Sequence, residues 1–185
     1  MRVFAALPLP PRAVESLSGI VDRLRARVPR ARWVSPDAFH LTMHFFGEVE
    51  GQPLSDLHRA FEDPRLTRSA VPVRFADLGQ FPPRGSPRVL WIGLTVDGSA
   101  LHDYWKTFES VVAPLGWESD KRGFAPHVTI ARAGNSPVDG RWSEGIDVPE
   151  FPFFLGECVL FQSVLSRDGA RYVPLKRIVF EGGSE

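Results

Sequence analysis

The sequence predicts an α+β fold in which two antiparallel-rich sheets, related by a pseudo-twofold axis and flanked by helices, face a central groove. Three observations predict it. Short runs of apolar or alternating residues, typical of strands, recur along the chain. Three longer segments repeat apolar residues at three- and four-residue steps, as amphipathic helices do. The order strand, helix, strands occurs twice. We therefore expect one bilobal domain over residues 1–185, with approximate internal repeats at 1–80 and 88–185.

Proline and glycine mark the ends of the elements in the first half. An apolar strand at 2–7 is ended by three prolines, and the amphipathic helix after it stops near Pro29. The other elements expected here are an extended stretch at 31–34, a strand at 39–46, a helix at 54–61 and a strand at 71–78.

The second half repeats this order after a Pro/Gly/Arg loop at 80–87. A strand at 89–96 leads into a helix at 101–115, which closes at Gly116. The elements expected after it are a strand at 124–132, a loop at 133–150, and extended runs at 151–165 and 171–180 around the hairpin signal Arg167-Asp168-Gly169.

Composition bounds the function. The 185 residues carry no net charge, which argues against a bulk electrostatic grip on long nucleic acid. Of the 22 basic residues 19 are arginine, a side chain suited to bidentate phosphate contacts.

The single cysteine, Cys158, lies in an apolar run and fits a core thiol in a reducing compartment. With no signal peptide or membrane-length apolar run visible, we expect a cytoplasmic protein that is not bound to membranes.

One short pattern occurs twice, on strands that each follow a helix. Residues 40–46 read His-Leu-Thr-Met-His-Phe-Phe, and residues 127–132 read His-Val-Thr-Ile-Ala-Arg. Because facing repeats every two residues along a strand, His40 and Thr42 share one side, as do His127 and Thr129. Two such strands side by side would present two imidazoles and two hydroxyls to one groove.

These groups suit phosphodiester chemistry. In-line displacement at phosphorus needs a base for the nucleophile and an acid for the leaving oxygen, and histidine titrates near neutrality, so His40 and His127 could share these tasks. The hydroxyls of Thr42 and Thr129 could donate hydrogen bonds to phosphoryl oxygens. The residues alone leave open which histidine is the acid.

Three neighbours are possible accessory residues. On a regular strand His44 and Phe46 share the face of His40, so His44 could contact a phosphate or sugar and Phe46 could stack on a base. Arg132 lies five residues after His127 and would face away unless the strand ends or bulges. His58 and His102 lie in helical stretches and fit ordinary surface positions.

The two motifs, His40-Leu-Thr-Met-His-Phe-Phe-Gly-Glu and Pro126-His-Val-Thr-Ile-Ala-Arg, resemble the signatures of the 2H phosphoesterase superfamily. Within it the chain resembles the RNA 2′,3′-cyclic phosphodiesterases, also called 2′-5′ RNA ligases. The opening residues 2–10, the Arg32-Trp-Val-Ser-Pro run and Pro87-Arg-Val-Leu-Trp-Ile-Gly extend the likeness over most of the chain. His44 departs from it, since many relatives have arginine there.

The resemblance implies a bilobal, pseudo-symmetric, metal-free and cofactor-free enzyme. It implies hydrolysis of an RNA-terminal 2′,3′-cyclic phosphate to a 2′-phosphomonoester, with His40 as the proton donor and His127 as the proton acceptor. Thr42 and Thr129 would hold phosphoryl oxygens, and Arg132 could add a phosphate contact. The partners implied are RNA ends or oligonucleotides with a cyclic phosphate, and we expect a monomer.

Three other interpretations stay open at this point. His40 and His44 are spaced four apart, which on a helix could bind zinc in a metallohydrolase. Their segment alternates like a strand, however, where such residues lie about 13 Å apart. The other two are a non-catalytic module that binds nucleotides or RNA ends, and a 2′-5′ RNA ligase acting in the joining direction. Phe81, Arg84 and Arg88 would serve either of them.

Overall fold

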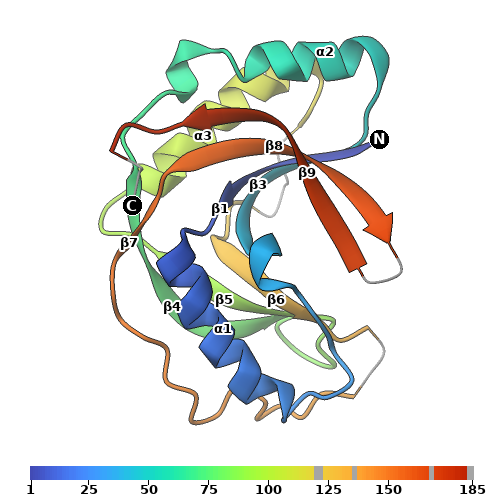
Figure 1. The fold of residues 1–185 in the computed structure, drawn as a ribbon, viewed down its shortest axis with the longest axis vertical. Coiled ribbons are helices and arrows are strands. Elements are labelled where there is room, and N and C mark those ends of the chain that lie inside the picture. Colours follow the sequence, from blue (N-terminus) through green and yellow to red (C-terminus); the bar gives the residue numbers. More distant parts are fainter. Residues whose placement is uncertain (119–122, 135–136, 167–168, 183–185) are drawn as a thin grey trace.

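The computed structural model describes residues 1–118, 123–134, 137–166 and 169–182, and it has the predicted α+β class. Nine strands and three α-helices occupy these residues, with three short 3₁₀ turns (Figure 1). The predicted hairpin turn falls partly outside the described residues, since Arg167 and Asp168 are not among them and Gly169 begins the last strand.

The elements lie close to the predicted ranges. Those of the first half are β1 (Arg2–Pro8), α1 (Pro11–Arg25), β2 (Arg32–Trp33), η1 (Pro36–Ala38), β3 (His40–Glu48), α2 (Gly51–Ala60), η2 (Pro64–Leu66) and β4 (Val71–Phe81). Those of the second half are β5 (Val89–Thr95), α3 (Ala100–Val112), η3 (Ala113–Leu115), β6 (His127–Arg132), β7 (Phe153–Leu155), β8 (Glu157–Ser166) and β9 (Gly169–Val179). Gly156 separates β7 from β8 within the single run predicted at 151–165.

The strands pair differently from the prediction of two separate sheets. They form one path in the order β7-β4-β5-β6-β3-β1-β8-β9, and β2 pairs with β6 beside it. The link between β6 and β3 is a single register pair, Leu41 with Val128, whereas β1 and β3 share seven. The sheet is therefore two four-stranded halves joined at one point, because the two motif strands touch where each begins.

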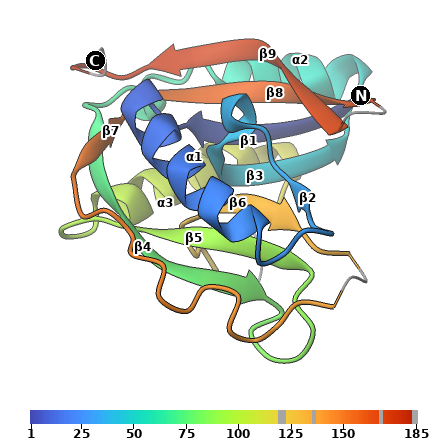
Figure 2. The same cartoon turned by 60° about the horizontal axis from the view of Figure 1, so that its bottom comes forward.

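The two halves of the sheet have equivalent topology. The unit β1-α1-β3 matches β5-α3-β6: in each a strand, a helix and a motif strand follow one another, and the two strands pair antiparallel. The halves exchange strands, however. β4 comes from the first half of the sequence and pairs with β5, while β8 comes from the second half and pairs with β1 (Figures 1 and 2).

Each α-helix buries part of its surface in the hydrophobic core. In Figure 1 α2 and α3 lie toward the top of the view, and α1 lies lower, in front of β4 and β5. Proline begins α1 at Pro11, and the buried face of the helix carries Leu17, Ile20 and Leu24. No helix within the described residues is long and apolar enough to cross a membrane.

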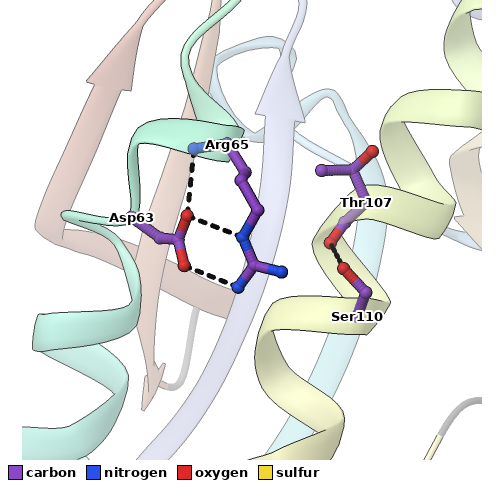
Figure 3. Close-up of polar contacts among 4 residues, drawn as sticks. All are labelled: Asp63, Arg65, Thr107 and Ser110. Carbon is purple, nitrogen blue, oxygen red and sulfur yellow. Dashed lines mark hydrogen bonds and ion pairs between the residues drawn. The ribbon is translucent and has the colours of Figure 1, made fainter.

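A capped turn fixes the end of α2 beside α3 (Figure 3). The Asp63 carboxylate accepts hydrogen bonds from the backbone N–H of Arg65 at 2.9 Å and from its guanidinium at 2.7 and 3.0 Å. This cap holds η2, whose Leu66 is fully buried. On α3 the Ser110 hydroxyl donates to the Thr107 carbonyl at 2.7 Å.

Candidate active site

The two motifs meet at the joint between the sheet halves. Leu41 of β3 lies opposite Val128 of β6 in antiparallel register, and both side chains are buried in the core. Extending that register by one residue each way places His40 opposite Thr129 and Thr42 opposite His127. Side chains opposite one another have Cβ atoms about 5 Å apart, and diagonal neighbours lie at about 7–8 Å. The predicted cluster of two imidazoles and two hydroxyls is therefore brought together on one sheet face.

A bulge interrupts β3 immediately after the motif. Thr42 is paired with Ala6 and His44 with Ala5, so Met43 is an extra residue without a partner of its own on β1. A bulge of this kind reverses the facing of every residue that follows it. Burial agrees, because Met43 and His44 are both buried and Phe45 is 67% exposed.

The bulge makes two predictions wrong. His44 does not share the groove face with His40: it is buried in the core, and its Nδ1 lies 2.8 Å from Oε1 of the buried Glu109 on α3. Phe46 is buried as well and packs against His44 and Trp117. The aromatic residue on the groove face is Phe45, in register with Phe4.

The same irregularity occurs in β6, where it turns Arg132 toward the site. Trp91 pairs with Thr129 and Leu90 with Ala131, which leaves Ile130 as the extra residue. Ala131 therefore faces the core, and Arg132 returns to the face of His127 and Thr129. Arg132 is close enough for its charge to lower the pKa of His40. The sequence allowed Arg132 to face the groove only if its strand ended or bulged, and the structure has such a bulge.

Each motif histidine is held by the same backbone contact. Nδ1 of His40 lies 2.7 Å from the carbonyl oxygen of Ala38, and Nδ1 of His127 lies 2.7 Å from that of Ala125. A carbonyl can only accept, so Nδ1 carries the proton in both rings. In the neutral imidazole this leaves Nε2 as an acceptor, and in the cation Nε2 becomes a donor. Either ring can therefore accept or deliver a proton through Nε2.

The protonation equilibrium of His40 is strongly shifted. Burial is the main cause that lowers its pKa from the ordinary 6.5 to about 4; the nearby charges of His127 and Arg132 contribute to this lowering, and the Ala38 carbonyl opposes it. The ring is only partly shielded from solvent, yet it lies among aromatic side chains. His40 is therefore neutral at pH 7 in the unliganded protein.

Aromatic rings surround His40 on its half of the sheet. The Phe4 and Tyr172 ring centroids lie 5.1 and 5.3 Å from that of His40, and Phe161 stacks on Phe4 at 5.4 Å. Phe4 is buried but lies outside the main core cluster, because it points to the groove side of the sheet. Phe4, Phe45 and Phe161 are site residues that the sequence did not identify.

A second aromatic group lies beside His127. Its ring centroid is 5.1 Å from that of Phe81 and 5.9 Å from that of Trp91. The Trp91 indole lies across Gly79 on the neighbouring strand, where a Cβ atom would come within 2.3 Å of the ring. Only glycine at 79 leaves this ring in place, and so each histidine has an aromatic surface next to it.

The positions of the side chains argue against two other kinds of chemistry, a metal bound by His40 and His44 and a nucleophilic Cys158. The bulge sends His40 and His44 to opposite faces of β3, so these two side chains cannot share an ion as a helical pair would. Within the described parts of the chain, no group of three or more His, Cys, Asp or Glu side chains could hold a metal. Cys158 is fully buried, which raises its pKa to about 12 and removes the thiolate that a nucleophile requires.

The chain is similar to known phosphoesterases in sequence and in fold. Residues 7–91 match the family model described as LigT like Phosphoesterase. The chain is 30% identical to the RNA 2′,3′-cyclic phosphodiesterase of Thermotoga maritima, covering 99% of this chain and 97% of that protein. It is 27% identical to the protein of that name from Geobacillus stearothermophilus, of which it spans about half, 52%. The crystal structure of E. coli LigT complexed with 3′-AMP is similar, with a TM-score of 0.76 and 28% identity over 97% of this chain and 98% of that one.

Proposed function

This chain belongs to the family of LigT-like phosphoesterases, and on that premise we propose that it hydrolyses RNA-terminal 2′,3′-cyclic phosphates to 2′-phosphomonoesters. The observation that carries the proposal is the equivalence of the two motif strands around the Leu41–Val128 pair. It gives one phosphate two imidazoles and two hydroxyls, related by a local twofold axis.

The proposed reaction is an in-line displacement at phosphorus. His127 accepts a proton from water as the water oxygen bonds to phosphorus. The bond between phosphorus and the 3′-oxygen breaks, and His40 delivers a proton to that oxygen, so that the 2′-oxygen keeps the phosphate. General acid–base catalysis of this kind contributes about 10²–10⁴ in rate for each group. No step calls for a metal ion.

Thr42, Thr129 and Arg132 are assigned to the phosphate itself. A threonine hydroxyl can donate to a non-bridging oxygen, and a guanidinium offers charged donors to the same anion. Charge builds on these oxygens as water attacks, and donors already aimed at them stabilise the transition state more than the ground state. His44 and Phe46 take no part in this proposal, since they face the core.

The donor role requires His40 to hold a proton when the substrate is bound. Its pKa of about 4 in the free protein means that the proton must arrive with the substrate. A cyclic phosphate carries a negative charge, which favours the imidazolium and raises that pKa. Proton-detected NMR of His40 with and without a bound 2′-nucleotide measures the change. A pKa that stays near 4 in the complex would assign the acid role to His127 instead.

A short RNA ending in 2′,3′-cyclic phosphate tests the function. We expect the wild-type protein to open it to the 2′-phosphate in EDTA as well as without it. His40→Ala and His127→Ala should each lose at least about 10²-fold in kcat. His58→Ala, a substitution on α2, is the matched control and should keep full activity.

Other results would separate the alternatives. A fully active His127→Ala protein would overturn the two-histidine scheme, and activity lost in EDTA and regained with zinc would overturn metal independence. Binding without turnover would favour a module that holds RNA ends. Adding an RNA with a 5′-hydroxyl end to the same reaction would detect a joined product, and so test whether the protein acts as a ligase. The cytoplasmic location and the monomeric state predicted from the sequence stay predictions.

A further inference from the structure

A pocket of about 300 Å³ opens beside His40. Its walls come from the ends of β1 and β3, from the 35–39 segment and from the paired strands β8 and β9. The lining residues used below are Ser35, Asp37, His40, Phe161, Arg171 and Tyr172. Its volume is at the small end of the range for ligand sites in proteins. A larger pocket of about 550 Å³, lined by Pro82, Ser86, Arg88 and Gly134, contains no motif residue.

The mechanism fixes which part of the substrate must lie near this pocket. In an in-line displacement the attacking water and the leaving oxygen are on opposite sides of phosphorus. If His40 protonates the 3′-oxygen, the ribose lies on the His40 side and the water on the His127 side. The base attached to that ribose must then lie on the His40 side too, where the pocket is.

The walls of the pocket suit a flat heterocycle. Phe161 and Tyr172 offer aromatic surfaces with centroids 6.1 Å apart, and both rings pack on the buried Phe4, which holds them in position. Aromatic side chains of this kind stack on nucleobases in proteins that bind single-stranded RNA. The 35–39 segment also supplies the Ala38 carbonyl that orients His40, so an occupant of the pocket lies in a fixed relation to the imidazole.

The polar groups of the pocket favour an amino edge over a second phosphate. The Ser35 hydroxyl donates to Oδ1 of Asp37 and so orients that carboxylate at the pocket. A carboxylate only accepts hydrogen bonds and repels an anion. Arg171, an exposed residue that also lines the pocket, brings a positive charge that offsets this repulsion for an anionic substrate.

We propose, resting on the function proposed above, that this pocket binds the base of the terminal nucleotide and that Asp37 makes the enzyme prefer guanosine ends. The Watson–Crick edge of guanine presents two adjacent N–H donors, which one carboxylate can accept together. Adenine and cytosine present one amino group. Uracil presents one N–H between two carbonyl oxygens, which a carboxylate repels. The expected order is guanosine, then adenosine and cytidine, then uridine.

The test compares kcat/KM for the four nucleoside 2′,3′-cyclic monophosphates. Wild-type protein should prefer the guanosine over the uridine substrate by roughly tenfold or more, the size expected of one bidentate base contact. Asp37→Asn should bring the two within about threefold of each other. Asp147→Asn makes the same charge change at an exposed position outside the pocket and should leave the ratio at its wild-type value.

The outcomes distinguish this proposal from the one on which it rests. Equal kcat/KM for all four substrates, or a ratio untouched by Asp37→Asn, overturns the base pocket while hydrolysis stands. No hydrolysis of any substrate overturns the proposed function. Calorimetric binding of 2′-GMP and 2′-UMP still tests the pocket in that case, and equal affinities refute it. A ratio that responds to Trp91→Leu but not to Asp37→Asn puts the base beside His127 and also refutes it.

Discussion

Nδ1 of His44 lies 2.8 Å from Oε1 of Glu109, and this contact joins β3 to α3 on the face of the strand opposite His40. Both side chains are buried, at 9% and 7% exposure. The pair therefore ties the motif strand to the helix behind it and takes no part in the groove.

Removing one member of this pair should cost stability and leave substrate binding unchanged. Removing one side of a buried hydrogen bond costs about 1–3 kcal/mol, because the remaining group loses that partner in the core. We expect His44→Ala to lower the free energy of unfolding by that order in urea titrations, with KM near the wild-type value. Arg74→Ala, which breaks the exposed Arg74–Asp97 pair, is the control and should cost about 1 kcal/mol or less. A raised KM with unchanged stability would mean that His44 faces the groove and contacts the substrate.

Phe45 and Phe46 should respond oppositely to truncation. The bulge at Met43 turns the Phe46 ring into the core and the Phe45 ring toward solvent, and the two side chains are accordingly 7% and 67% exposed. Phe46→Ala should lower the free energy of unfolding by about 3–5 kcal/mol, as other buried phenylalanines do. Phe45→Ala should change it by about 0.5 kcal/mol or less. Thermal and urea unfolding measure both, and the reverse order, with Phe45→Ala the costlier change, would mean that β3 has no bulge.

Arg132→Ala should weaken catalysis and raise the pKa of His40. Its guanidinium is assigned to the phosphate, and a hydrogen bond to a charged group is worth about 1.5–3 kcal/mol, or roughly 10- to 100-fold in kcat/KM. The same positive charge lowers the pKa of His40, so its removal should move that pKa upward from about 4. NMR titration of the His40 ring measures the shift. Arg30→Ala is the control, and an unmoved pKa in Arg132→Ala would place the guanidinium away from the site.

The depressed pKa of His40 should make the fold sensitive to acid. The unfolded chain takes up a proton on this residue near pH 6.5, whereas the folded chain does so only near pH 4. Between these values the unfolded state binds more protons, so the free energy of unfolding should fall as the pH falls, by at most roughly 3 kcal/mol. Urea unfolding across this range in wild type, His40→Gln and His127→Gln measures it. The His40→Gln protein should lose the dependence that the other two keep, and parallel slopes in all three would contradict the shift.

The periodicity of the sequence was enough to predict most elements and the strand faces of His40, Thr42, His127 and Thr129. Strand alternation brought His40 to the side of Thr42, and His127 to the side of Thr129, before any pairing was known. The bulges were not predictable, because an extra residue such as Met43 or Ile130 looks like any other apolar residue in a strand. The predicted strand face was therefore wrong for each residue after a bulge. His44 and Phe46 lie in the core, and Arg132 lies on the groove face.

Other parts of the site depend on contacts between distant segments. Tyr172 and Phe161 reach His40 because β8 pairs with β1, a pairing that no local pattern indicates. One available signal was the alanine two residues before each motif histidine, at Ala38 and Ala125. Its repetition marks the two carbonyls that orient the rings.

The paired bulges have a consequence for the direction of the reaction. Under the local twofold axis Phe45 and Arg132 occupy equivalent positions, each at the second place after an extra residue. A site of full twofold symmetry would accept a phosphodiester in two orientations of equal energy, and the two histidines would exchange roles between them. An aromatic ring on one side and a cation on the other make the two orientations unequal. The difference between these two side chains thus determines the orientation in which the phosphodiester binds, which the symmetric backbone alone would leave undetermined.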